Sequence, residues 1–282
     1  MAVERILMLV KTYPSPSGKY GEIVCTAGIN IDTLEWRRVF PYPFRTVDED
    51  VRFDKWDVVE MPLERTNNDK CPESRRLTDV NAIRVLEHIA VGDNFWTPRA
   101  PYFGVGLAKS VDEVLQQMLS EDRQTWGPTI RIVRAKPGTA RLIGEPQEAT
   151  WDAEQQAKLN RAKENLEQDM FADPELVKHF RTLERPPFSL RLEFQDLLGK
   201  THSLLLMDWE FPRLLLRELK SKGSKEAALE NVRFKVEQQI FAAHREPHLI
   251  LGGINHGYMQ RQIGIIGHFS PQARNQDSFF GT

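Results

Sequence analysis

Cysteine, long apolar runs and net charge are all scarce in this sequence. Its 282 residues include only two cysteines, Cys25 and Cys71, which excludes a disulfide framework and a zinc site built on paired thiolates. The longest apolar runs, residues 6–10 and 204–207, are far shorter than the ~20 residues that a membrane-spanning helix needs. We therefore expect a protein of the cytoplasm that has no membrane partner.

The charges nearly cancel, because 38 lysines and arginines meet 40 aspartates and glutamates and leave a formal net charge of −2. This balance argues against a protein that binds nucleic acid indiscriminately, since such binding depends on an excess of cations.

Signatures of enzymes are also missing. The Gly199-Lys200-Thr201 triplet, for example, has Phe194 where a phosphate-binding loop needs a glycine. The sequence favours a protein without catalysis and without a cofactor.

Short apolar and β-branched runs separated by turn residues dominate the first hundred residues and predict strands. The strands are expected at residues 5–12, 22–31, 35–40 and 55–63. They form a meander of the kind that closes into a small barrel of the oligonucleotide-binding (OB) type. Beyond them, helical spacing predicts a short helix over residues 110–120. Runs at 129–133 and 139–143, on either side of Pro137 and Gly138, predict a hairpin.

The second half of the chain predicts a long helix followed by a second group of strands. The helix starts near Thr150, which can cap it, and Pro186 and Pro187 end the connecting segment. Strict alternation over residues 189–195 then indicates a strand with one buried face. Further strands at 202–209, 249–251 and 262–269, with a helix at 224–244, give the order ββαββ.

These patterns predict an α+β protein with two β-rich lobes that helices join and cover. The N-terminal lobe, residues 1–149, is expected to be an OB-like barrel with a hairpin extension. Residues 150–187 are expected to form a helical connector, and residues 188–282 the C-terminal ββαββ domain. No sequence repeat of fixed period links the two lobes.

Residues 35–45 are the most informative candidate for a binding surface. In an extended chain Trp36, Arg38 and Phe40 share one face, and Tyr42 continues it. Aromatic rings interleaved with arginines suit base stacking and phosphate contacts. The alternative interpretation is that the rings belong to the core and the arginines cover its rim.

Two further segments contribute basic and aromatic residues to this predicted surface. One is the loop at residues 13–21 with its flanks, and the other is the predicted hairpin. The full set of predicted nucleic-acid-binding residues is Lys11, Tyr13, Lys19, Tyr20, Trp36, Arg38, Tyr42, Arg45, Arg131, Arg134, Lys136 and Arg141. A second basic run, over residues 213–225, can also follow a phosphate backbone. Each run is equally compatible with an ordinary solvated surface.

Catalytic groups are weaker candidates in this sequence. Asp208 and Glu210 lie at the end of a predicted strand, where carboxylates act as bases or cap the following helix. His256 and His268 lie near the last two strands and can approach each other. No convincing pattern of metal ligands is present, so no metal site is predicted.

A family resemblance lies in three segments of the first third of the chain. They are residues 21–29 (Gly-Glu-Ile-Val-Cys-Thr-Ala-Gly-Ile), 36–41 (Trp-Arg-Arg-Val-Phe-Pro) and 71–74 (Cys-Pro-Glu-Ser). These segments resemble the Cys-Val-Ala-Gly strand, the Trp-Ile-Arg-Pro strand and the Pro-Glu-Asn triplet of the prokaryotic dual OB-containing domain family. The sequence departs from that pattern at Val39 and Ser74. The resemblance implies two OB-type barrels, nucleic-acid contact through Trp36 and Arg38, and an association with mobile elements or antiviral defence.

The leading hypothesis from the sequence is a nucleic-acid-binding accessory protein of a prokaryotic defence or mobile-element system. It is expected to bind a single strand by stacking bases on aromatic rings and by holding phosphates with lysines and arginines. One alternative is a metal-dependent nuclease or nucleotide-processing enzyme that uses the carboxylates and histidines named above. Another is a protein-interaction subunit of a larger complex.

Overall fold

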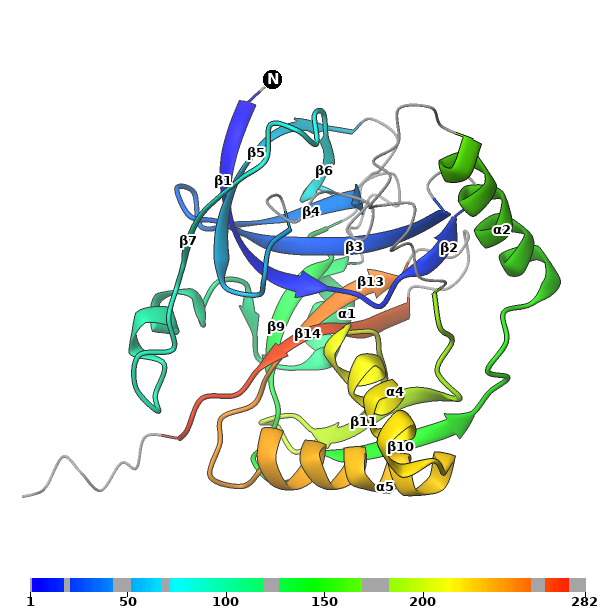
Figure 1. The fold of residues 1–282 in the computed structure, drawn as a ribbon. Helices are drawn as coiled ribbons and strands as arrows, with labels where there is room; N and C mark the ends of the chain where they lie inside the picture. Colours follow the sequence, from blue (N-terminus) through cyan, green and yellow to red (C-terminus); the bar gives the residue numbers. More distant parts are fainter. Residues whose placement is uncertain are drawn as a thin grey trace, which may run out of the picture.

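The computed structural model describes residues 2–17, 21–42, 52–66, 71–118, 127–168, 183–254 and 262–273. In these ranges two seven-stranded sheets form two lobes that pack against each other, with helices on the outside (Figure 1). The fold is therefore α+β with two β-rich lobes, as the sequence predicts. No helix in the described ranges combines the length and the apolar character that a membrane crossing requires.

The first lobe contains a closed barrel. Its strands are β1 (Ala2–Lys11), β2 (Ser15–Ser17), β3 (Gly21–Asn30), β4 (Glu35–Tyr42), β5 (Asp57–Arg65), β6 (Ser74–Leu77) and β7 (Arg84–His88). Because β1 pairs with both β3 and β5, five strands close in the order β1-β3-β4-β6-β5. Neighbours in the barrel are antiparallel except β4 and β6, which are parallel. β2 and β7 extend it by pairing with β3 and β5.

Both faces of β1 are buried, and this explains its unbroken apolar run. Ile6 and Met8 belong to the core of the barrel, together with Tyr42. Leu7 and Leu9, on the opposite face, belong to a core that the two lobes share. A strand with one face in solvent would instead alternate apolar and polar residues.

The second lobe holds the remaining strands and most of the helices. Its strands are β8 (Leu107–Ala108), β9 (Ile130–Arg134), β10 (Arg141–Pro146), β11 (Phe188–Gln195), β12 (Thr201–Leu206), β13 (His248–Ile254) and β14 (Gln262–Phe269), in the sheet order β10-β11-β12-β14-β13-β9-β8. The helices are α1 (Val111–Met118), α2 (Ala153–Gln168), α4 (Glu210–Lys222) and α5 (Lys225–Lys235), and a π turn, Val236–Ile240, extends α5. Of these, α2 lies against β2 and β3 of the first lobe (Figure 1).

The second sheet repeats the connectivity of the barrel when β9 and β10 are taken as one bent strand. β9 pairs with β13 and β10 pairs with β11, just as β1 pairs with β5 and β3. The parallel pair β12 and β14 then corresponds to the parallel pair β4 and β6. The predicted hairpin at 129–143 is therefore wrong, because β9 and β10 pair with different neighbours. Pro137 and Gly138 bend the chain there, and a bend and a hairpin have the same local sequence signal.

The structure also adds a helix to the predicted ββαββ order. α4 starts at Glu210, and Gly223 ends it in a left-handed conformation with φ 70°. Ser224 then caps α5 by accepting a hydrogen bond from the amide of Ala227. The sequence predicts α1 and α2 correctly, but it misses four strands. β2, β6 and β8 are too short for periodicity to reveal, and all five residues of β7 are exposed, so it has no buried face that alternation could mark. Strands β8 to β10, which the prediction assigns to the N-terminal domain, belong to the second sheet.

Main-chain contacts and a shared core hold the two lobes together. Thr12 and Asp208 form an isolated antiparallel bridge, and the amide of Trp209 donates to the carbonyl of Lys11 at 2.8 Å. The shared core joins apolar side chains of both sheets, among them Leu7, Ile29, Trp36, Ile250, Ile266 and Phe269. Residues 207–209 are thus fixed at the boundary between the lobes.

Candidate functional site

Trp36 and Tyr42, two of the three rings of the predicted stacking surface on β4, are not at the surface, whereas Phe40 is 45% exposed. Trp36 is 6% exposed and lies in the core between the lobes, where its Nε1 donates a hydrogen bond to the carbonyl of Val105 at 3.0 Å. Tyr42 is fully buried in the barrel, with its ring centroid 5.3 Å from that of Phe53. The prediction that these rings face solvent is therefore wrong, and the alternative interpretation as core residues is confirmed. Trp36 is buried because the second lobe covers its face of β4, whereas Tyr42 lies in the core of the barrel itself.

Two predicted arginines are occupied by contacts within the protein. Arg38 donates from Nη2 to the hydroxyl of Thr129 at 2.8 Å, and so links β4 to the segment that enters β9. Arg131 donates from Nε to the side-chain oxygen of Gln117 at 2.8 Å, and burial lowers its pKa. Both side chains therefore hold elements of the fold together.

The remaining predicted binding residues are dispersed. Arg134 is half-buried, whereas Lys136 and Arg141 are exposed in and after the bend between β9 and β10. Arg141 donates to two nearby main-chain carbonyls of that bend. Four predicted site residues, Lys19, Tyr20, Arg45 and His256, lie outside the described residues.

Lys11 and Tyr13 do come together, at the boundary of the lobes. The ring of Tyr13 lies 5.9 Å from that of Trp209, centroid to centroid. Lys11 Nζ and Arg213 Cζ lie 5.6 and 5.7 Å from the centroid of the Trp209 ring. We refer to Lys11, Tyr13, Trp209 and Arg213 as the Tyr13–Trp209 cluster. Both of its rings are half-buried, and Arg213 is exposed.

The structure brings three of the four catalytic candidates together. Asp208 follows β12, Glu210 starts α4, and His268 lies on β14, the parallel neighbour of β12. Asp208 Oδ2 lies 2.8 Å from His268 Nδ1, and Asp208 Oδ1 accepts the amide of Glu210 at 3.1 Å. On the other side of the imidazole, Nε2 lies 3.6 Å from Glu210 Oε2. A buried carboxylate that fixes one nitrogen of an imidazole leaves the other nitrogen for proton transfer.

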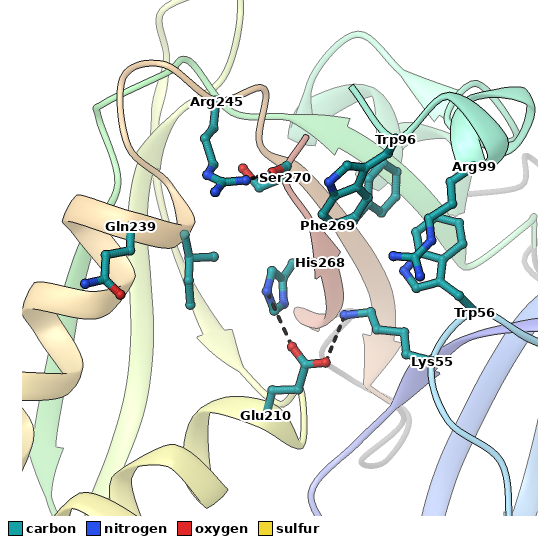
Figure 2. Close-up of a pocket in the computed structure, with 11 residues that line it drawn as sticks. Lys55, Trp56, Trp96, Arg99, Glu210, Gln239, Arg245, His268, Phe269 and Ser270 are labelled. Carbon is teal, nitrogen blue, oxygen red and sulfur yellow. Dashed lines mark hydrogen bonds and ion pairs between the residues drawn. The ribbon is translucent and has the colours of Figure 1, made fainter. Parts of the chain in front are cut away.

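A lysine from the first lobe completes this group. Lys55 Nζ lies 3.6 Å from Asp208 Oδ2. It also lies 3.5 Å from Glu210 Oε1 (Figure 2). Burial by itself raises the pKa of Asp208, but Lys55 and His268 outweigh it, so the pKa is below its ordinary value. Asp208, Glu210 and His268 have atoms within 4.8 Å of one another, a spacing that a divalent cation can bridge. Lys55 already supplies a positive charge beside these three residues. The sequence-based expectation that the protein has no metal site stays a prediction.

Glu210, His268 and Lys55 lie on the wall of a cavity of about 480 Å³ between the lobes, which we call the junction pocket (Figure 2). The first lobe contributes Lys55, Trp56, Trp96 and Arg99 to its lining. The second lobe contributes the other residues, which are Glu210, Gln239, Ile240, Arg245, His268, Phe269 and Ser270. Its volume lies within the range of small-molecule sites, roughly 300–1,000 Å³.

Arg99 is held against the aromatic wall of the junction pocket. Its Cζ lies 4.6 Å from the ring centroid of Trp56 and 5.1 Å from that of Trp96. Nε donates to the carbonyl of Ile89 at 2.9 Å, and Nη2 lies 3.2 Å from His88 Nε2. Burial lowers the pKa of Arg99 to about 10, so the guanidinium stays charged at neutral pH.

Backbone strain is concentrated at this pocket. Of the three non-glycine residues with positive φ in the described ranges, two are Trp56 (φ 77°) and Trp96 (φ 55°). Bulky residues rarely adopt this conformation, and such strain is often found at functional sites. Gln239 and Ile240 belong to the π turn, another irregularity that is frequent at such sites.

Sequence reasoning misses most of the junction pocket. Turns flank Lys55 and Trp56, and they also flank the Phe95-Trp96 pair. Arg99 follows Trp96 by three residues. Aromatic residues beside an arginine in a loop are the signal that was present. Arg245 and Ser270 carry no recognisable signal, because only the folding of the second lobe brings these two segments together.

The fold and the site define a class: a two-lobed α+β protein with a closed five-stranded barrel, a second sheet and a pocket between them. Two family models match the chain. Residues 2–104 match a domain of unknown function (DUF8758), and residues 108–282 match a second domain of unknown function (DUF8757). The second match spans more than half of the chain, so the chain belongs to the DUF8757 family. No curated protein matches it.

Proposed function

We propose that this protein binds single-stranded nucleic acid through the Tyr13–Trp209 cluster. The observation that carries the proposal is a pair of half-exposed rings, 5.9 Å apart, with the cations of Lys11 and Arg213 beside one of them. Aromatic rings stack on bases of any sequence, and flanking cations attract phosphates. With a net charge of −2, affinity has to come from such local contacts rather than from overall charge.

The connectivity of the barrel supports this proposal. Closure in the order β1-β3-β4-β6-β5 with a parallel β4–β6 pair is the arrangement of an OB-type barrel, and we propose that both lobes are of this type. In OB folds the loop between the first two strands of the barrel contributes to oligonucleotide binding, and Tyr13 lies in the corresponding loop. Fold alone does not define function, so the cluster remains the main support. A role in defence or mobile elements rests on the N-terminal resemblance, and a cytoplasmic location rests on the short apolar runs of the sequence.

Binding of short labelled oligonucleotides to the full chain tests the proposal. We expect single-stranded DNA or RNA to bind at near-physiological salt, and the double variant Trp209→Ala with Arg213→Ala to weaken binding by about tenfold or more. The matched control is Phe234→Ala with Arg76→Ala, two exposed residues outside the cluster. The proposal fails if no single strand binds at micromolar protein, or if the folded double variant binds as tightly as the natural sequence.

A nucleotide-processing enzyme is a second candidate, favoured by the convergence of Asp208, Glu210 and His268. Nucleotides and oligonucleotides are the substrates to assay, with Mg²⁺ and with EDTA. If the site is catalytic, His268→Gln should abolish turnover. His202→Gln is the matched control, because its imidazole pairs with Asp196 at 2.9 Å and does not line the junction pocket. Turnover that survives His268→Gln excludes this histidine as the acid or base.

A further inference from the structure

We propose that the junction pocket binds a nucleotide with a terminal phosphate, either free or at the end of a strand. The proposal goes beyond the function proposed above, because it rests on the cavity and not on the Tyr13–Trp209 cluster. Three features of the pocket carry it: unused hydrogen-bond donors, an excess of cations, and an aromatic wall opposite an amide.

Arg245 and Ser270 supply the unused donors. Arg245 Nη1 donates to the carbonyl of Ser270 at 2.8 Å. Arg245 Nε and Ser270 Oγ, in contrast, are buried and meet no hydrogen-bond partner within the described part of the chain, and Ser270 is only 4% exposed. A buried donor without a partner is destabilising and uncommon in folded proteins, so it indicates a missing acceptor. A phosphate offers several acceptor oxygens to a guanidinium and a neighbouring hydroxyl.

A second arginine of the pocket strengthens the attraction for an anion. Lys55 lies between Asp208 and Glu210, which offset its charge, whereas Arg99 is held by a main-chain carbonyl and His88. Arg99 therefore adds positive potential to the pocket while Arg245 provides the direct contact. An anion with two charges gains most from this arrangement, and a terminal phosphate is such a group.

The remaining walls suit a planar base and a sugar. Figure 2 shows Trp96 and Gln239 on opposite sides of the cavity. Trp96 is half-buried and offers an aromatic surface, while the exposed amide of Gln239 can donate to and accept from the edge of a base. Glu210 and His268 lie between these walls and offer acceptors for sugar hydroxyls. A phosphate, a sugar and a planar base together make a nucleotide.

Calorimetry on the full chain tests this inference with defined probes. The probes are the ribonucleoside 5′-monophosphates, the matching nucleosides, inorganic phosphate, and short oligonucleotides with a 5′-phosphate or a 5′-hydroxyl. We expect at least one monophosphate to bind about tenfold or more tightly than its nucleoside and than phosphate alone. Tighter binding of the 5′-phosphorylated strand than of both the mononucleotide and the 5′-hydroxyl strand assigns the site to a strand end. Any other order assigns it to a free nucleotide.

Variants locate the binding and keep the test decisive. Arg245→Gln should weaken binding of the monophosphate about tenfold, whereas Arg76→Gln, an exposed arginine outside the pocket, should not change it. If Arg245→Gln unfolds the protein, Gln239→Ala replaces it, with the exposed Gln238→Ala of the same π turn as its control. Absence of binding at millimolar probe, equal affinity for nucleoside and nucleotide, or unchanged binding by the folded variants overturns the inference. Because oligonucleotide binding through the Tyr13–Trp209 cluster is measured with other variants, either proposal can fail alone.

Discussion

Asp208 and His268 are joined by a buried hydrogen bond of 2.8 Å between neighbouring parallel strands of the second sheet. The bridge between Thr12 and Asp208 fixes the main chain of Asp208 against the first lobe, and Lys55 of that lobe lies 3.6 Å from its carboxylate. Asp208 therefore contributes both to the geometry of the site and to the association of the two lobes.

Asp208→Ala should destabilise the protein by about 3–5 kcal/mol, because it leaves Lys55 without a buried counterion. Urea unfolding at neutral pH measures the change. Asp112→Ala is the control, since its pair with Lys200 is exposed and such pairs contribute about 0–1 kcal/mol. Equal losses of unfolding free energy in the two variants would show that the buried pair stabilises the protein no more than the exposed pair does.

Trp36→Ala should destabilise the protein by about 3–5 kcal/mol, since it opens a cavity in the core that the lobes share. Thermal unfolding is the measurement. Phe40→Ala, on the same strand but 45% exposed, serves as the control and should change stability by about 0.5 kcal/mol or less. A Trp36→Ala variant that keeps its melting temperature and loses nucleic-acid binding would instead restore the stacking surface predicted from the sequence.

Gly28→Ala should weaken the barrel, because a Cβ at this position would collide with the carbonyl of Leu7 on the paired strand β1. We expect a loss of about 1–3 kcal/mol or more, as overpacking against backbone cannot be relieved by a rotamer change. Gly104→Ala is the control, since nothing lies within 4 Å of its added Cβ. Similar melting temperatures for the two variants would contradict the close approach of β1 and β3.

His248 should make the protein sensitive to acid. Burial lowers its pKa from 6.5 to about 4, and the ring stacks on Phe269 with centroids 4.6 Å apart. Between these two pH values the unfolded chain binds a proton that the folded chain does not, so stability should fall by about 3 kcal/mol as pH drops from 6.5 to 4. Urea unfolding across this range, with the natural sequence and His248→Phe, checks the prediction. An unchanged pH dependence in the variant would assign the effect to other groups.

Sequence patterns find the long elements of this fold because each buries a regular set of side chains. The alternation at residues 189–195 gives β11, and the helical spacing after Ser110 and Thr150 gives α1 and α2. The same patterns cannot show which strand pairs with which, so the bend between β9 and β10 is predicted as a hairpin. Alternation also identifies residues that share a face without showing what covers that face, and Trp36 is misplaced for this reason.

The candidate site was only partly predictable. The sequence identifies Asp208, Glu210 and His268 as candidate catalytic residues. Their proximity follows from the parallel pairing of β12 and β14, which no local pattern reveals. Lys55 and Arg245 come from different lobes, so their relation depends on how the sheets pack. Sequence periodicity carries no information about that packing.

The junction pocket draws its walls from both family segments, with Trp96 and Arg99 before the boundary and Arg245 and His268 after it. Neither half forms this pocket alone. If evolution ever separated the two modules onto different polypeptides, both would have to be inherited and expressed together for the pocket to form.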